Sequence, residues 1–291
     1  MFNTCAAPNA VRCKCDQWAR QPLLALLMRL YVELAKKSFQ RQVAYRTAAL
    51  AGLITNMFFG VLRASILIAV YNAQTSSVPN YSVRDAITYT GMTQAFIGAV
   101  ALWGWFDMIK SIKSGEVASD LARPYDYYNF WLAQDLGRSL FQLFTRGALG
   151  MLIFIVFFGA SVPSSWSQWA LVAVSTLLAL LLSFSWRFLA SAMAFWTTDA
   201  VGWMRLASLG ILLPTGFMIP LAFMPAWLQA LCYLTPFPGM INTPVEMYLG
   251  RATGGGALFL IGLQAGWLIG LVMLGRLAAY AGRRKLTIQG G

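Results

Sequence analysis

The sequence predicts an all-α integral membrane protein with six transmembrane helices, on the basis of its composition, its apolar segments and its charge distribution. Of 291 residues, 58% are hydrophobic and only 11% are charged, whereas a soluble domain carries about 25% charged residues. Such a chain could not keep its apolar surface away from water, so we expect the lipid bilayer to surround it.

Each predicted span is a mainly apolar segment of roughly the length that crosses the hydrocarbon core, about 20 residues of helix. A helix also satisfies its own backbone hydrogen bonds, which lipid cannot do. The spans form a transmembrane domain over residues 47–280 and cover 47–70, 86–105, 139–158, 169–194, 201–223 and 257–280.

The distribution of Lys and Arg predicts the orientation of these spans. Eighteen of the 22 lie before residue 47, in or beside the connections after the second and fourth spans, or at the C-terminal end. Only Arg84 and Arg251 lie on the other side. Because cationic loops stay on the cytoplasmic side, we expect a multi-pass protein of the inner (plasma) membrane with both termini in the cytoplasm. The asymmetry also explains the net charge of +12 without a nucleic-acid partner.

Several kinds of chemistry lack the residues that they need. The chain has no histidine, and Cys5, Cys13 and Cys15 have no fourth ligand beside them for a zinc site. No G-x-x-x-x-G-K-S/T phosphate loop occurs, so we do not expect this chain to hydrolyse ATP or to hold a cofactor. A proton-coupled carrier commonly needs a carboxylate inside the bilayer, but the acids are expected at span edges or in loops. These acids are Asp85, Asp107, Asp126, Asp135, Asp199 and Glu246.

Segments outside the spans have their own patterns. Residues 1–27 lack an apolar core long enough for a signal peptide, so we expect a disordered cytoplasmic tail. Residues 28–46 predict a basic amphipathic helix along the inner leaflet, acting either as a plain anchor or as a substrate or partner site. Its apolar face would combine Leu27, Leu30, Tyr31, Leu34 and Phe39. Residues 281–291 predict a C-terminal cytoplasmic tail.

A polar strip, MIKSIKSGEVASDLARPYDYYNF, follows the second span at residues 108–130. Met108, Ile109 and Ile112 recur at helical spacing. Gly115 can end that helix in a left-handed cap, and Pro124 disfavours helix in the residue before it. We therefore expect a short helix, a break, a second short turn and a new aromatic-rich helix, forming either a solvated loop or a contact surface.

Two arginines are predicted inside spans, where insertion costs roughly 2.5–3.5 kcal/mol for each. Arg63 and Arg146 either contact an anionic substrate or lipid, with Asn56 on the same pathway, or make helix-to-helix hydrogen bonds. Asn56 and Gln142 are the partners expected in the second case.

The connection between the last two spans is apolar yet repeatedly broken. Its prolines are Pro225, Pro236, Pro238 and Pro244. Non-helical backbone at membrane depth persists only where protein covers it or where it lines a cavity. The segment therefore predicts either short helices that re-enter the membrane or an interfacial loop anchored by Trp227, Tyr233 and Tyr248.

Three motifs resemble those of type-2 (ABC-2-like) ATP-binding cassette exporter permeases. The stretch IKSGEVASDLARP, residues 112–124, resembles the loop that these permeases place between spans two and three. The stretch FMIPLAFMPAWLQALCYLTPFPGMI, residues 217–241, is similar to their proline-bearing segment, and AGRRKLTIQGG to the C-terminus of one branch. The resemblance covers residues 28–291 and leaves the N-terminal tail unmatched.

The resemblance implies roles for these segments. The polar strip would be a coupling helix docked on a separate ATP-binding subunit, present in two copies, with ATP and Mg held there. The contact residues would be Lys110, Lys113, Ser114, Gly115, Glu116, Asp120 and Arg123. The proline-bearing segment would form re-entrant helices that close the outer gate, through the four prolines and Trp227.

The resemblance implies ATP-driven export, and a membrane-lined path with few charges suits a lipid-like or amphipathic substrate. The chain would pair with a second permease, identical or homologous. Small-residue faces such as Gly262, Gly266 and Gly270 predict close helix packing, either within the chain or with that second permease. A secondary, ion-coupled transporter and a non-catalytic membrane scaffold are the alternatives.

Overall fold

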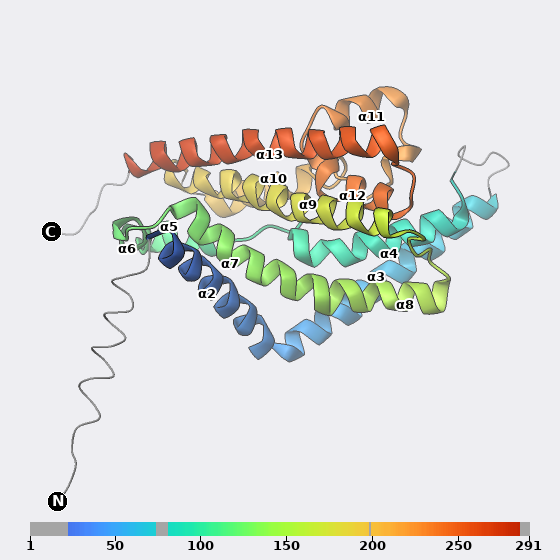
Figure 1. Cartoon of the computed structure of the whole chain (residues 1–291), viewed down its shortest axis with the longest axis horizontal. Coiled ribbons are helices and arrows are strands. Elements are labelled where there is room, and N and C mark those ends of the chain that lie inside the picture. The colour runs from blue at the N-terminus through green and yellow to red at the C-terminus, as the bar shows by residue number, and fades with distance from the viewer. Residues whose placement is uncertain (1–22, 74–80, 198, 286–291) are drawn as a thin grey trace, which may run out of the picture.

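The computed structural model describes residues 23–73, 81–197 and 199–285, which form helices and turns without a β-strand (Figure 1). The chain begins with α2 (Leu23–Ala44), α3 (Arg46–Ala73), α4 (Val83–Val100), α5 (Asp107–Ser114) and α6 (Val117–Ala122). It continues with α7 (Tyr127–Gln142), the π-helical segment η1 (Leu143–Ala148), α8 (Leu149–Phe158), α9 (Trp166–Ala192) and η2 (Met193–Phe195). It ends with α10 (Ala200–Gly210), η3 (Leu221–Phe223), α11 (Ala226–Tyr233), η4 (Phe237–Met240), α12 (Asn242–Tyr248) and α13 (Gly254–Arg283).

Among the described residues, four helical segments are long and apolar enough to cross a membrane. They cover Thr47–Ala69, Tyr127–Phe158, Trp166–Phe195 and Gly254–Arg283. They match the predicted first, third, fourth and sixth spans, although the third begins well before the predicted residue 139. The helix starts at Tyr127 because Asp126 caps it by accepting from the Asn129 N–H at 2.8 Å. It can include Asp135 and Arg138 because their charges pair with each other inside the protein.

The other two predicted spans take a different form. Residues 86–105 become α4, which ends at Val100 and lies almost wholly buried inside the bundle. A single helix over 201–223 was a wrong prediction, because α10 ends at Gly210 and irregular turns follow. Pro214 and Pro220 interrupt this stretch, and Gly216 adopts a φ of 79°, so a continuous helix is not available to it.

The ends of the chain also differ from the predicted boundaries. Helix α2 begins at Leu23, within the segment predicted as a tail, and α13 continues to Arg283. The remainder of both predicted tails, residues 1–22 and 286–291, lies outside the described residues.

Helix α9 lies at the centre of the bundle, with its longest contact along α13 and further contacts to α12, α7 and α4. Figure 1 shows α7–α8, α9 and α13 running roughly alongside one another and α2 and α3 crossing obliquely, with α5, α6, the start of α2 and the end of α13 gathered at one end. The opposite end carries the start of α4, the end of α8 and the short helices α11 and α12. The structure therefore has one end that carries α5 and α6 and an opposite end that carries α11 and α12, and α9 runs between them.

Helix α2 packs along α7 through part of its predicted apolar face. Phe39 meets Phe141 edge to face with ring centroids 5.4 Å apart, and Ser38 Oγ donates to the Gln134 carbonyl at 2.6 Å. Leu30 instead lies exposed. The two helices lie in close contact at Gly137, where a Cβ would overlap the Ala35 carbonyl oxygen.

We expect Gly137→Ala to lower the thermal unfolding temperature in detergent, because the overlapping atom belongs to the backbone and cannot turn aside. Overpacking of this kind costs about 1–3 kcal/mol. Gly256→Ala in α13 is the matched control, since a Cβ there meets no atom within 4 Å and alanine favours helix by about 1 kcal/mol. Equal unfolding temperatures for the two variants would show that α2 does not pack on α7 in this way.

Candidate functional site

The polar strip folds locally as its sequence predicts. Helix α5 ends at Gly115, which takes a left-handed φ of 80° and donates its backbone N–H to the Ile112 carbonyl at 3.3 Å. Helix α6 follows, and Asp126 then caps α7 by accepting from the Asn129 N–H at 2.8 Å. The break at Gly115 and the new helix after Pro124 are thus confirmed.

The strip has one buried and one exposed face. Met108, Ile109, Ile112 and Val117 are buried. The predicted contact residues that lie exposed are Lys110, Lys113, Ser114, Gly115, Glu116 and Arg123. Asp120 is half-buried and accepts a hydrogen bond from Ser111 Oγ at 3.2 Å. A Cβ at Gly115 would meet nothing within 4 Å, so the end of α5 presents open, charged surface.

The buried face joins the strip to the long helices. Ile109 packs in a cluster with Ala190 of α9 and with Ala200 and Met204 of α10. Met108, Ile112 and Val117 belong to a second cluster that includes Phe184 and Phe188 of α9 and Tyr127 and Tyr128 of α7. A force on the exposed face therefore reaches α9, α10 and α7 through close-packed side chains.

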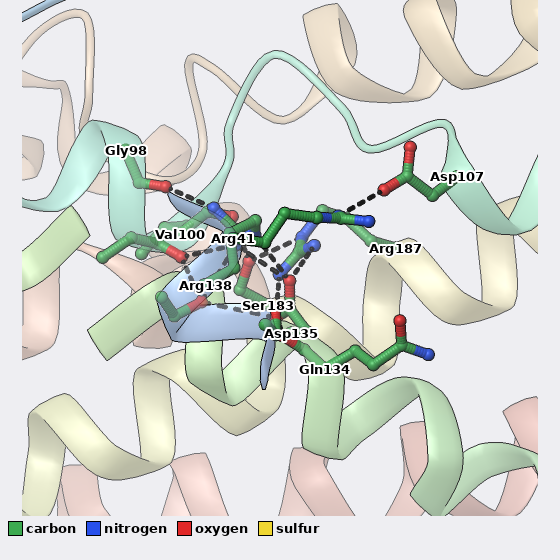
Figure 2. Close-up of polar contacts among 12 residues, drawn as sticks. Arg41, Gly98, Val100, Asp107, Gln134, Asp135, Arg138, Ser183 and Arg187 are labelled. Carbon is green, nitrogen blue, oxygen red and sulfur yellow. Dashed lines mark hydrogen bonds and ion pairs between the residues drawn. The ribbon is translucent and has the colours of Figure 1, made fainter. Parts of the chain in front are cut away.

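A buried charge cluster, formed by Asp135, Arg138 and Arg187, lies beside the start of α5 (Figure 2). Asp135 of α7 is 1% exposed and accepts from Arg187 of α9 at 3.1 and 2.8 Å, one bond to each oxygen. Arg138, one turn further along α7, donates to Asp135 Oδ1 at 2.9 Å. The carboxylate thereby fixes the register of α7 against α9.

The same cluster holds the end of α4. Arg138 donates to the Gly98 and Ala99 carbonyls at 2.8 and 3.0 Å, and Ser183 donates to the Val100 carbonyl at 2.5 Å. The chain then leaves α4 through Ala101, the one residue other than glycine with positive φ in the described ranges 23–73, 81–197 and 199–285. The connection into α5 is thus anchored to both α7 and α9.

The position of Asp135 corrects the expectation that every acid lies at a span edge or in a loop. Asp135 is inside α7, within the candidate span Tyr127–Phe158. The signal was present in the sequence, because Asp135 and Arg138 have the i, i+3 spacing of a helical ion pair. Their partner Arg187 is 52 residues away, and no local pattern predicts that contact.

The two arginines that the sequence predicts inside spans, Arg63 and Arg146, donate to backbone carbonyls, and neither donates a hydrogen bond to the predicted partners Asn56 and Gln142. Arg63 of α3 donates from Nη2 to the Phe217 carbonyl and, at 2.8 Å, to the Met218 carbonyl. Arg146 of η1 donates to the Ala48 carbonyl of α3 at 3.2 Å. One nitrogen of each guanidinium, and Asn56 Nδ2, are buried without a hydrogen-bond partner.

The proline-bearing segment forms short helices tied to the bundle by buried polar groups. Pro225 precedes α11, which contains Trp227; Pro236 precedes η4, which contains Pro238; and Pro244 lies in α12. Gln264 of α13 donates to the Gly239 carbonyl at 2.7 Å and accepts from Ser175 Oγ at 3.0 Å. The Tyr89 hydroxyl lies 2.9 Å from the Gly216 carbonyl and 3.0 Å from Asn242 Oδ1.

We expect Asp135→Asn to destabilise the protein by about 3–5 kcal/mol, because it leaves two buried guanidiniums without their anion. Thermal unfolding in detergent measures the loss. The control is Arg41→Gln, which removes an exposed ion pair with Asp107 at 3.2 Å and should cost about 1 kcal/mol or less. A similar small effect of both substitutions would contradict the stabilising role assigned to Asp135 in the buried charge cluster.

Comparison with known proteins identifies the family. The model of a family described as ABC-2 family transporter protein matches residues 59–290. A search of curated proteins finds no match to the chain. The matched region contains the polar strip, the buried charge cluster and the proline-bearing segment. The chain therefore belongs to the ABC-2 family of transporter proteins, as a multi-pass membrane component that works with an ATP-binding subunit.

Proposed function

We propose that this chain is the permease subunit of an exporter that moves a lipid-like or amphipathic substrate across the inner membrane. ATP hydrolysis in two copies of a separate ATP-binding subunit would drive it, with Mg in that partner. The observation that carries the proposal is the strip α5–Gly115–α6, which exposes charged residues outward and buries apolar ones against α9 and α10.

The strip suits a contact that changes with the nucleotide state of the partner. Its exposed tip carries Lys110 and Lys113 beside Glu116, so both positive and negative side chains can contact a groove of the ATP-binding subunit. Exposed charges specify the partner and speed its association more than they add affinity. The buried face gives the partner a rigid connection to the long helices, since packed interiors transmit displacement.

The proposed orientation places the strip in the cytoplasm. The start of α2, the strip and the end of α13 lie at one end of the bundle (Figure 1). The strip and the end of α13 contribute the cations Lys110, Lys113, Arg123, Arg283 and Arg284 there. By the same argument α11 and α12 face outward. We infer that they re-enter the membrane as an outer gate, because each is far shorter than the length needed to cross.

The six-span topology is part of this proposal. Helix α4, enclosed by the bundle, would be the second span, and α10 with the irregular segment after it would be the fifth. A second permease has open apolar surface to pack on, because a Cβ at Gly262, Gly266 or Gly270 of α13 meets nothing within 4 Å. Arg63 and Arg146 are half-buried, and a contact of either with an anionic group on a substrate or lipid, with Asn56 on the same pathway, is also part of the proposal.

We expect Glu116→Arg to reduce co-purification with the ATP-binding subunit, and the ATPase rate of the complex, by about tenfold, as for the loss of one charge-assisted contact. The Glu116 side chain makes no capping hydrogen bond, so the substitution leaves the strip folded. Lys37→Glu, an exposed charge reversal on α2, is the control. Unchanged assembly and ATPase rate in the Glu116 variant would remove the strip from the coupling path.

Cysteine labelling tests the orientation. In a background without native cysteines, we expect Glu116→Cys to react with an impermeant maleimide only in inverted vesicles. Ser164→Cys, in the connection between α8 and α9 at the opposite end, should react in intact cells. The reverse pattern would place the strip outside and contradict the proposed function.

A further inference from the structure

An apolar groove of about 640 Å³ runs along the side of the bundle between α4, α7–η1–α8 and α9. We call it the lateral groove. Its floor is formed by the buried residues Phe96, Met151 and Leu180. Phe144 and Leu177 form opposite walls and are 63% and 55% exposed. Apart from Thr176 and the polar atoms of Trp169 and Tyr248, its side chains carry no polar group.

The groove has the length of one acyl chain in a leaflet. On α9 its lining extends from Trp169 to Leu180, which is about 16 Å at 1.5 Å per residue. The hydrocarbon core of a bilayer is about 30 Å thick, so one leaflet contributes about 15 Å. Both walls belong to candidate spans, Tyr127–Phe158 and Trp166–Phe195, so the groove opens directly onto the exposed apolar faces that lipid covers.

One end of the groove carries aromatic side chains. Trp169 and Tyr248 meet edge to face, with ring centroids 5.9 Å apart. They lie near the start of α9, at the end of the bundle opposite the strip (Figure 1). Trp and Tyr favour the headgroup level of a membrane, where one part of the ring is apolar and another meets polar groups.

The π-helical turn shapes one wall of the groove. Leu143, Phe144, Gly147 and Ala148 of η1 all line it. At Gly147 the wall comes close to α4, where a Cβ would be 3.0 Å from the Ala95 carbonyl oxygen. The neighbouring Arg146 turns the other way and binds α3. A π turn is rare and frequently marks a functional position.

We propose that the lateral groove binds one acyl chain of an outer-leaflet phospholipid, with the ester end at Trp169 and Tyr248 and the chain end between Leu140 and Leu180. The assignment to the outer leaflet rests on the orientation proposed above, and binding of the chain does not depend on transport. The groove is continuous with the lipid-facing surface of two spans, and its length and aromatic end fit a chain entering from that side.

Photo-crosslinking tests the proposal with the full chain in nanodiscs of phosphatidylethanolamine. One probe lipid carries a diazirine near the carbonyl of its acyl chain, and a second carries it at the terminal carbon. We expect the first to label peptides containing Trp169 or Tyr248 and the second to label those containing Leu140 or Leu180. Ala173→Phe fills the groove from α9 and should lower both crosslinking yields about tenfold. The phenyl ring would displace about two methylenes of the acyl chain from the groove, and each buried methylene contributes about 0.8 kcal/mol to binding.

Ala170→Phe is the matched control, because Ala170 is exposed on the same helix but does not line the groove. Ala148→Phe fills the groove from the opposite wall and repeats the test if Ala173→Phe does not fold. Equal labelling of the Ala173 and Ala170 variants, a reversed order of the two probes, or crosslinking of groove peptides to a second copy instead of lipid would each overturn the proposal. None of these readouts uses ATPase activity, so failure here is distinguishable from failure of the proposed function.

Discussion

The buried carboxylate of Asp135 is the interaction on which the arrangement of helices depends. An ion at 1% exposure costs several kcal/mol unless partners replace its water. Here Arg138, one turn further along the same helix, and Arg187 of α9 do so. The arginines in turn need acceptors beyond one carboxylate. They find them partly in the last carbonyls of α4, which have no partner within their own helix. The carboxylate, the two guanidiniums and the α4 carbonyls thus satisfy one another's charge or hydrogen bonds. This fixes α4, α7 and α9 in one register.

This constraint bears on how the strip could move. The connection from α4 to α5 leaves the clamped carbonyls directly, and Arg187 also lies over the Trp105 ring, 5.9 Å from its centroid. The strip therefore cannot shift alone without straining the hydrogen bonds that Arg138 and Ser183 donate to the last carbonyls of α4. A partner that displaces it would move α9 and α10 with it through Ile109, Ala190 and Met204, as one body. Rigid-body motion is the expected response of a closely packed interior, which switches between arrangements and does not deform gradually.

Local rules predicted the parts of this fold that depend on local chemistry. Gly115 ended α5 because a left-handed cap needs glycine, and four long apolar segments became candidate spans because length and hydropathy suffice to define them. The failures came where tertiary contacts decide. Asp135 was expected outside the bilayer because its partner Arg187 is distant in sequence, and α10 was expected to continue because apolar composition does not reveal the turns after Gly210. The helical spacing put Leu30 on the apolar face of α2, yet Leu30 is exposed because α7 covers only part of that face.

The irregular backbone at membrane depth follows from the same requirement for partners. Lipid offers no hydrogen bonds, so a break in a helix persists only where protein groups meet its freed atoms. Arg63 does this at the turns after α10, where it donates to the Phe217 carbonyl and the Met218 carbonyl, and Arg146 reaches from the π turn to a carbonyl of α3. A guanidinium carries five donors, so Arg63 can serve two carbonyls and still leave one nitrogen without a partner. Arg146 serves one carbonyl and also leaves one nitrogen without a partner. The charge that makes Arg63 costly in lipid is thus used where the backbone departs from a regular helix.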